Sequence, residues 1–233
     1  MLSEEIAIVL IWDYLHSRPL PTEGFEFALD DGTPSFVRPL RPEDAPRLHQ
    51  GLDHLSHLAS RRKFPFDGEQ TTAQIIEQVT HADGTHEVAW GAADLNAPDQ
   101  PGIGVARYQR LEHEPDAADV AIVILDQYMN KGAGVLLHAV LHLQAHHAGL
   151  HHLYYDVAAD NQRFIRHLRS LGAEYVGRAV DVTRLKCPVF GEAYKISHLK
   201  PNARRFAQTL RRLSHVPPSA LGQEDADDQS MAI

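Results

Sequence analysis

The sequence predicts one α/β domain of the α+β kind, in which helices flank a central mixed, mostly antiparallel sheet. Three apolar stretches separated by turn residues predict an antiparallel meander of consecutive strands. After them, a strand, a glycine turn and an amphipathic helix follow one another, and a further strand and helix come next. At 233 residues, with 43% hydrophobic and 23% charged residues, the chain can bury a substantial core.

The N-terminal half of the domain opens with a strand and two helices. A turn-rich link at residues 18–33 precedes the first expected strand, Ser35–Leu40. Pro42 and two acidic residues then begin a helix that runs to about Leu58, since proline and carboxylates both suit the first turn of a helix. A second helix is expected at Thr71–Thr80. The strands of the meander are Glu87–Asp94, Gly102–Leu111 and Ala117–Leu125.

The C-terminal half alternates helices with strands. A helix at Lys131–Ala148 places one stripe of side chains along a single side, namely Leu137, Val140, Leu141, Gln144 and Ala148. The remaining expected elements are a strand at His152–Val157, a helix at Asn161–Leu171, strands near Tyr175–Val182 and Glu192–Ile196, and a basic helix at Pro201–Leu213. Past Val216, a composition of Pro, Ser, Gly, Asp and Glu predicts a disordered acidic tail.

The stretch from Ala118 to Leu137 carries the clearest sign of a ligand site. An apolar strand leads into Gly132-Ala133-Gly134, and a helix follows at once. Glycines permit close approach of the backbone, and free N–H groups at the positive end of a helix dipole favour an anion. The pattern therefore predicts a phosphate-binding turn, although the same glycines would also suit a simple tight turn before a helix.

The order and spacing of these pieces resemble the GNAT superfamily of acyl-CoA-dependent N-acyltransferases. In that family a strand leads into Gln/Arg-x-x-Gly-x-Gly/Ala and a helix, and a later strand leads into Asn and a helix closing in Leu-Gly-Phe. Here Asn161 and Leu171-Gly172 follow the glycine turn, and residues 37–45 resemble a common start of the domain. Met129 replaces the Gln or Arg, and Leu168 replaces a Tyr proposed as general acid. The resemblance spans residues 35–197 and implies a sheet splayed between its fourth and fifth strands.

The resemblance implies an N-acetyltransferase that moves an acetyl group from acetyl-CoA to an amine, either a protein lysine or a small-molecule amine. A protein lysine comes slightly first, because residues 55–64 loosely resemble bacterial protein-lysine acetyltransferases. The rival interpretation is a non-catalytic acyl-CoA-binding or scaffold protein of the same fold. Met129, Leu168 and the short side chain of Asp119 favour it.

The resemblance also implies which residues contact the coenzyme. The backbone of one strand would run beside the pantetheine, the glycine turn would hold the pyrophosphate with its N–H groups, and Asn161 would combine a coenzyme contact with a helix N-cap. The strand residues are Ile122, Val123 and Ile124, and the turn residues are Asn130, Lys131, Gly132, Ala133, Gly134 and Val135.

Acyl transfer to an amine requires that the amine lose a proton, that the oxyanion be stabilised and that the thiolate leave. Asp119 is the expected catalytic base, because it occupies the position of a Glu in protein acetyltransferases of the resembling family. A solvated residue at the start of a strand is the other interpretation, and Glu112, His113 and Glu114 are competing bases. A backbone N–H on the strand at 120–124 would face the thioester carbonyl.

Histidines raise the question of a metal site. His138, His142 and His146 are spaced to share one helix face, and such spacing can bind zinc or nickel. No carboxylate in the helix joins them, and the face lies opposite the expected apolar stripe. A solvated face is therefore expected, and no metal is predicted.

Composition narrows the partners and the compartment. A formal net charge of −9 and a pI of about 5.9 argue against nucleic acid as a partner. Cys187 is the only cysteine, which excludes a disulfide within the monomer and favours a reducing cytoplasm. The apolar run Ile6–Trp12 is too short to span a bilayer and follows two glutamates, so it is expected to dock on the core or on the partner copy of a homodimer, without membrane contact. The expected divisions are an N-terminal extension at 1–34, the acetyltransferase domain at 35–200, and a basic helix with an acidic tail at 201–233.

Overall fold

The structure is a computed structural model that describes residues 19–53, 71–99, 102–197 and 203–217. Within these ranges the strands are β1 (Phe25–Ala28), β2 (Pro34–Pro39), β3 (Glu87–Asp94), β4 (Gly104–Leu111), β5 (Glu114–Ile124), β6 (His152–Ala158), β7 (Glu174–Arg178) and β8 (Val182–Pro188). The helices are η1 (Pro42–Asp44), α2 (Ala45–Asp53), α4 (Thr72–Thr80), η2 (Asp126–Tyr128), α5 (Ala133–His147), α6 (Gln162–Ser170), α7 (Ala193–Ser197) and α8 (Arg204–Leu213).

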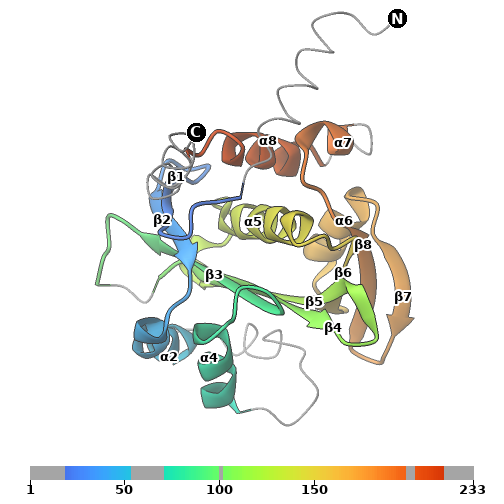
Figure 1. The fold of residues 1–233 in the computed structure, drawn as a ribbon, viewed down its shortest axis with the longest axis horizontal. Coiled ribbons are helices and arrows are strands. Elements are labelled where there is room, and N and C mark those ends of the chain that lie inside the picture. The colour runs from blue at the N-terminus through green and yellow to red at the C-terminus, as the bar shows by residue number, and fades with distance from the viewer. Residues whose placement is uncertain (1–18, 54–70, 100–101, 198–202, 218–233) are drawn as a thin grey trace, which may run out of the picture.

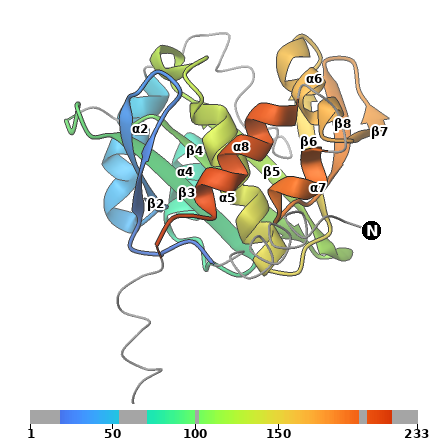
Figure 2. The same ribbon diagram turned by 90° about the horizontal axis from the view of Figure 1, so that it is seen from above.

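The strands form one mixed sheet in the order β1-β2-β3-β4-β5-β6-β8-β7. Neighbouring strands are antiparallel except for β5 and β6, which are parallel. Helices α2 and α4 lie on one side of the sheet, and α5 lies on the other with α8 beyond it (Figure 1). Figure 2 shows α8 lying over α5. The predicted fold class is confirmed.

β5 and β6 separate partway along their length. Parallel pairing joins only Ala117–Val120 to His152–Tyr155, although β5 continues to Ile124 and β6 continues to Ala158. Because β1 precedes the first strand expected from the sequence, the expected fourth and fifth strands correspond to β5 and β6. The sheet is therefore splayed at the predicted place.

Three element predictions need correction. The strand expected near Tyr175–Val182 is confirmed only as β7, which ends at Arg178, and β8, which begins at Val182, was not predicted. The strand expected at Glu192–Ile196 is helix α7, in which Ala193 and Ile196 are buried at helical spacing. β1 lies within the stretch interpreted as a turn-rich link, where alternate residues of this short strand are buried against the core.

α5 is buried nearly all round, so the predicted one-sided apolar stripe is wrong. His138 and His142 are 0% exposed, because α8 covers the side of α5 that faces away from the sheet. The ring of Phe206, on α8, lies 5.0 Å from the His138 ring and 5.1 Å from the His142 ring. The expected solvated face is therefore a helix–helix interface at these two histidines.

A capping motif begins helix α4 close to the expected residue. The Thr71 side chain accepts from the backbone N–H of Gln74 and the Gln74 side chain accepts from the backbone N–H of Thr71, which caps α4.

The segments 6–12, 54–64 and 218–233, on which further predictions depend, lie outside the described residues. The divisions after residues 34 and 200 stay predictions. No helix in the described ranges combines the length and the apolar character needed to cross a membrane.

Candidate active site

The predicted phosphate-binding turn enters α5 through a left-handed backbone conformation. Asn130 has a φ of 68° and Gly132, the N-cap of α5, has a φ of 97°. A Cβ atom on Gly132 would lie 2.7 Å from Oδ2 of Asp30, closer than a side chain tolerates. Glycine is therefore needed here for the backbone angle, whereas the Asp30 carboxylate, at the end of a flexible side chain, could shift.

The N–H groups of this turn are available to a ligand. Within the described part of the chain, the amides of Gly132, Ala133, Gly134 and Val135 donate to no acceptor. Three of them belong to the first turn of a 15-residue helix, where the helix dipole places partial positive charge. The turn has the donors and the electric field that a pyrophosphate requires.

Acidic residues of the β1–β2 turn flank this site, and each is paired with a cation. The backbone N–H of Asp30 donates to the carbonyl oxygen of Lys131 at 2.9 Å, and the Asp30 carboxylate pairs with Arg205 of α8. Asp31 Oδ2 lies 3.4 Å from Lys131 Nζ. The β1–β2 turn and α8 thus support the phosphate-binding turn without leaving an unpaired negative charge in these two pairs.

Asn161 begins α6 as its N-cap. Its Oδ1 accepts from the backbone N–H of Phe164 at 3.3 Å, which confirms the structural half of its predicted role. Since β5 and β6 are parallel, their carboxyl ends lie at the same edge of the sheet, and both α5 and α6 begin there. Asn161 and the glycine turn therefore border the same end of the splay, and the predicted coenzyme contact of Asn161 stays a prediction.

Ile122, Val123 and Ile124 lie on the part of β5 beyond its pairing with β6. Each of them pairs with β4 on one side, and in the described structure no strand pairs with their other side. Such an open strand edge accepts an extended ligand by main-chain hydrogen bonds. Their predicted role beside pantetheine is geometrically possible, and the three side chains are partly buried.

Asp119 lies on the face of the sheet that α2 and α4 cover. Its neighbour in β4 is Gln109, whose Oε1 contacts Nε2 of Gln78 in α4 at 3.5 Å. Its Oδ1 accepts from Arg184 Nη2 at 2.5 Å, and its side chain is 42% exposed. The carboxylate is therefore reachable but already engaged, and its role as base stays a prediction.

Two other carboxylates on this face differ in their affinity for protons. Hydrogen bonds from Lys186 and then Tyr154 lower the pKa of Glu114, one of the competing bases, so it takes up a proton less readily. Burial raises the pKa of Glu87 even though Arg107 Nη1 donates to it at 2.5 Å. Glu87 carries no sequence motif, and only its burial beside Arg107 marks it as a candidate proton acceptor.

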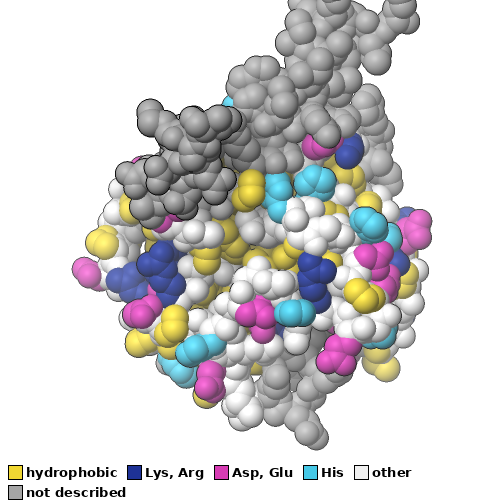
Figure 3. Space-filling view, in the orientation of Figure 1, with side chains coloured by type: hydrophobic (Ala, Val, Ile, Leu, Met, Phe, Trp, Pro, Cys, Tyr) yellow, Lys and Arg dark blue, Asp and Glu magenta, His cyan; other side chains and the backbone are white. Residues whose placement is uncertain are grey.

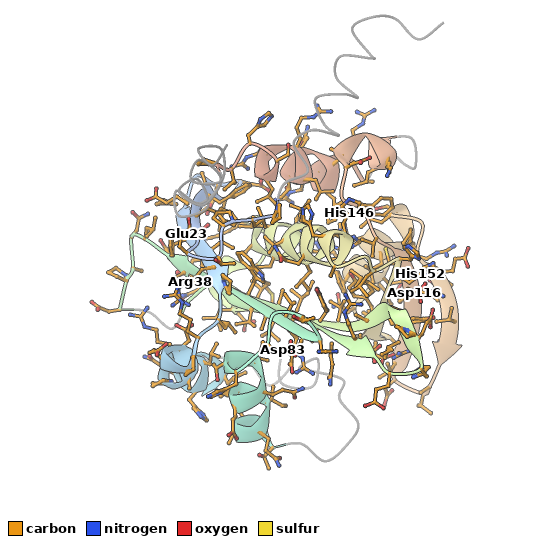
Figure 4. The ribbon with its side chains drawn as sticks, in the orientation of Figure 1. Glu23, Arg38, Asp83, Asp116, His146 and His152 are labelled. Atoms are coloured by element: carbon orange, nitrogen blue, oxygen red, sulfur yellow. The ribbon has the colours of Figure 1, made fainter. Side chains whose placement is uncertain are left out.

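A mostly apolar cavity of 280 Å³ lies beside this face, between the sheet and the helices α2 and α4. Leu48, Leu52, Ile75, Val79, Val105 and Val123 are among the residues that line it. Arg38 of β2 is labelled in Figure 4. It holds the start of α2 by a two-pronged ion pair with Asp44, each N–O distance being 2.7 Å. Figure 3 shows charged side chains of both signs spread around apolar ones in this view.

On the opposite side of the sheet, buried histidines form a hydrogen-bonded chain. The backbone N–H of Phe190 donates to His142 Nδ1 at 3.1 Å, so neutral His142 carries its proton on Nε2. His142 Nε2 contacts His138 Nε2 at 3.0 Å, and the Tyr155 hydroxyl lies 2.6 Å from the same His138 atom. His138 Nδ1 in turn contacts His167 Nε2 at 3.0 Å.

The chain of contacts joins α5, α6 and β6. When the imidazoles are neutral, both ring nitrogens of His142 and of His138 have hydrogen-bond partners, and His167 Nε2 accepts from His138 Nδ1. Among the described residues, no group of three or more His, Cys, Asp or Glu is arranged to hold a metal ion.

Comparisons with known proteins agree with the fold. Residues 36–174 match the family model described as Acetyltransferase (GNAT) domain. The chain is 26% identical over 154 residues to Acetyltransferase Pat of Mycolicibacterium smegmatis, covering 66% of this chain and 45% of that protein. It is 28% identical over 135 residues to Acetyltransferase PA5475 of Pseudomonas aeruginosa, covering 58% of this chain and 72% of that protein. The chain thus spans less than half the length of the first of these relatives.

A solved structure shares the fold. The GNAT domain of S. lividans PAT superposes with a TM-score of 0.62 at 22% identity, covering 71% of this chain and 96% of that domain. At this identity the likeness concerns the fold alone.

Proposed function

Because the chain belongs to the GNAT acetyltransferase family, we propose that it transfers an acetyl group from acetyl-CoA to a primary amine. The observation that carries the proposal is the phosphate-binding turn: four free amides at the start of α5 adjoin the open edge of β5. An acyl-CoA needs both, an anion site for its pyrophosphate and an extended edge for its pantetheine.

The residues present fit acetyl-CoA as co-substrate. Residues 130–135 would hold the pyrophosphate, Ile122, Val123 and Ile124 would run beside the pantetheine, and Asn161 would contact the coenzyme from α6. Met129 is 43% exposed and brings no polar group, so the turn would bind through its backbone.

The acceptor is proposed to approach from the side of α2 and α4. The amine nitrogen attacks the thioester carbonyl carbon, Asp119 takes the proton that the amine loses, and a backbone N–H of β5 stabilises the oxyanion. The C–S bond then breaks and the thiolate takes a proton from water, since Leu168 is buried and has none to give. The apolar cavity suits the methylene stem of a lysine side chain, which supports a protein lysine ahead of a small polar amine.

Thiol release tests the proposal. Mixing the chain with acetyl-CoA and a panel of lysine peptides and small amines should release free thiol in proportion to acetylated product. Calorimetry should show coenzyme A binding under the same conditions.

The second candidate is a non-catalytic acyl-CoA-binding or scaffold protein. The observation that favours it is the ion pair of Asp119 with Arg184, which occupies one oxygen of the expected base. Tight coenzyme A binding without thiol release across a broad amine panel would support it.

The buried thiol of Cys187 supports the cytoplasm as the proposed compartment, because a free cysteine persists most simply under reducing conditions. A homodimer is the proposed assembly if residues 6–12 dock on a second copy. Size-exclusion chromatography with light scattering on the chain with and without residues 1–18 tests this, and equal masses would argue against that docking.

A further inference from the structure

One side chain ties three strands together beside the splay. Arg184 of β8 donates from Nη1 to Asp156 Oδ2 of β6 and from Nη2 to Asp119 Oδ1 of β5, each at 2.5 Å. Its guanidinium carbon also lies 5.0 Å from the centroid of the Tyr154 ring. The exposed fractions of the Arg184, Asp119 and Asp156 side chains are 32%, 42% and 25%, so this cluster borders solvent.

The two carboxylates belong to the two strands that separate. Asp119 pairs with Tyr154, one position before the last pair of β5 with β6. Asp156 is the first residue of β6 beyond that pair, and it lies opposite Arg184 in β8. Arg184 therefore bridges the entrance of the splay on the side of the sheet where the acceptor is proposed to bind.

The arrangement fixes one oxygen of Asp119 and leaves the other available. The planar fork of arginine can bind two carboxylates at once, which a lysine cannot do with the same geometry. Oδ1 accepts from Arg184, whereas Oδ2 accepts from no group in the described ranges. Without the guanidinium, the negative charges of Asp119 and Asp156 would repel each other and the Asp119 side chain would lose its anchor.

We propose that Arg184 is a positioning residue for acetyl transfer, which holds Asp119 so that Oδ2 accepts the proton from the attacking amine. This inference rests on the proposed function. The proton passes from the amine nitrogen to Oδ2, directly or through one water, as the C–N bond forms, and the C–S bond breaks to release the thiolate. Asp156 serves as the second anchor of the guanidinium.

The test compares three variants under steady-state conditions. Arg184→Gln should lower kcat about 10- to 100-fold, the loss typical of a misplaced catalytic group, without changing the KM for acetyl-CoA or the affinity for coenzyme A. Those two quantities depend on residues 122–124 and 130–135 and on Asn161, and in the described structure the Arg184 side chain makes no hydrogen bond or ion pair with any of them. Arg184→Lys should restore part of kcat, because it keeps the charge but loses the fork.

Lys186→Gln is the matched control. Lys186 lies two residues along the same strand, is 28% exposed, pairs with Glu114 at 2.9 Å and lies 5.3 Å from the same Tyr154 ring. Lys186 does not contact Asp119, so the kcat of Lys186→Gln should stay within about twofold of the wild type, as expected for an ion pair at the border of solvent. An equal loss in Lys186→Gln and Arg184→Gln would overturn the inference, because the effect would then belong to this edge of the sheet as a whole.

Other outcomes decide between the inference and its premise. If the wild type releases thiol and Arg184→Gln does so equally fast, the inference alone fails. A parallel loss of coenzyme A affinity in Arg184→Gln would also overturn it, because the defect would be one of folding. If the wild type releases no thiol with any amine, the proposed function fails and the inference fails with it. Should Arg184→Gln not fold, Arg184→Lys alone must show a lower kcat at unchanged coenzyme A affinity.

Discussion

Mild acid should destabilise the fold through the buried imidazoles of His138, His142 and His167. Burial lowers the pKa of His142 to about 3 and that of His167 to about 4, and it holds the pKa of His138 well below the usual value. The same side chains titrate near about 6.5 in an unfolded chain. Between these values the unfolded chain binds more protons than the folded one, so stability is lost as the pH falls from about 6.5 towards 4.

The loss of unfolding free energy at pH 5 is set by protonation of these histidines in the unfolded chain, because in the folded chain they are still neutral at that pH. Protonation of each imidazole in the unfolded chain then lowers the free energy of unfolding by about 2 kcal/mol, from about 1.5 pH units at about 1.4 kcal/mol per unit. The three imidazoles together lower it by about 6 kcal/mol. The whole stability of a domain is only about 5–15 kcal/mol. The fold cannot easily accept the proton instead, since an N–H on His142 Nδ1 would point at the N–H of Phe190.

His167→Gln isolates the contribution of one imidazole. A glutamine oxygen can accept from His138 Nδ1 but does not titrate, so the loss of unfolding free energy between pH 8 and pH 5 should shrink from about 6 to about 4 kcal/mol. Urea unfolding followed by circular dichroism measures both values. Comparing the two losses cancels the other titrating groups and any cost of the substitution that does not depend on pH. An equal loss in variant and wild type, or no loss in the wild type, would refute the reasoning.

Three further predictions concern the coenzyme site, the base and the histidines. Gly134→Asp should bind coenzyme A about 10- to 100-fold more weakly than Gly134→Asn, because the negative charge of the aspartate repels the pyrophosphate. A Cβ atom at residue 134 has room in both variants, since its nearest neighbour would lie 3.7 Å away. Equal affinities by calorimetry would place the coenzyme elsewhere. Asp119→Asn should keep coenzyme A affinity but slow acetyl transfer about 100- to 10,000-fold. The defect should be smaller at high pH, where more of the amine is already deprotonated. Unchanged turnover would shift the role of catalytic base to Glu112, His113 or Glu114. Untagged protein prepared without metal columns should hold no stoichiometric zinc, and a tightly bound equivalent dependent on His138 and His142 would contradict this.

The features that were predictable from the sequence depend on neighbours along the chain. The Gly132 turn and the Asn161 cap are local patterns, and both begin helices as expected. The partner of Asp119 was not predictable in this way, because Arg184 lies 65 residues away on β8, a strand that was itself missed.

Tertiary contacts account for the other misses. A histidine spaced to face solvent on an isolated helix is buried once a second helix covers it, and α8 does this to His138 and His142. α7 is five residues long, too short for its periodicity to distinguish a helix from a strand.

The short parallel pairing of β5 with β6 divides the sheet into two blocks, β1–β5 and β6–β8, joined by four residue pairs. A pantetheine lying along the open edge of β5 would take the position of a removable strand between the blocks. We therefore expect the coenzyme to slow amide hydrogen exchange in β6 and β8, on the far side of the gap, as well as in β5 that it touches. In that case the substrate is also part of the architecture, and the chain without it opens more readily along this seam than elsewhere in the sheet.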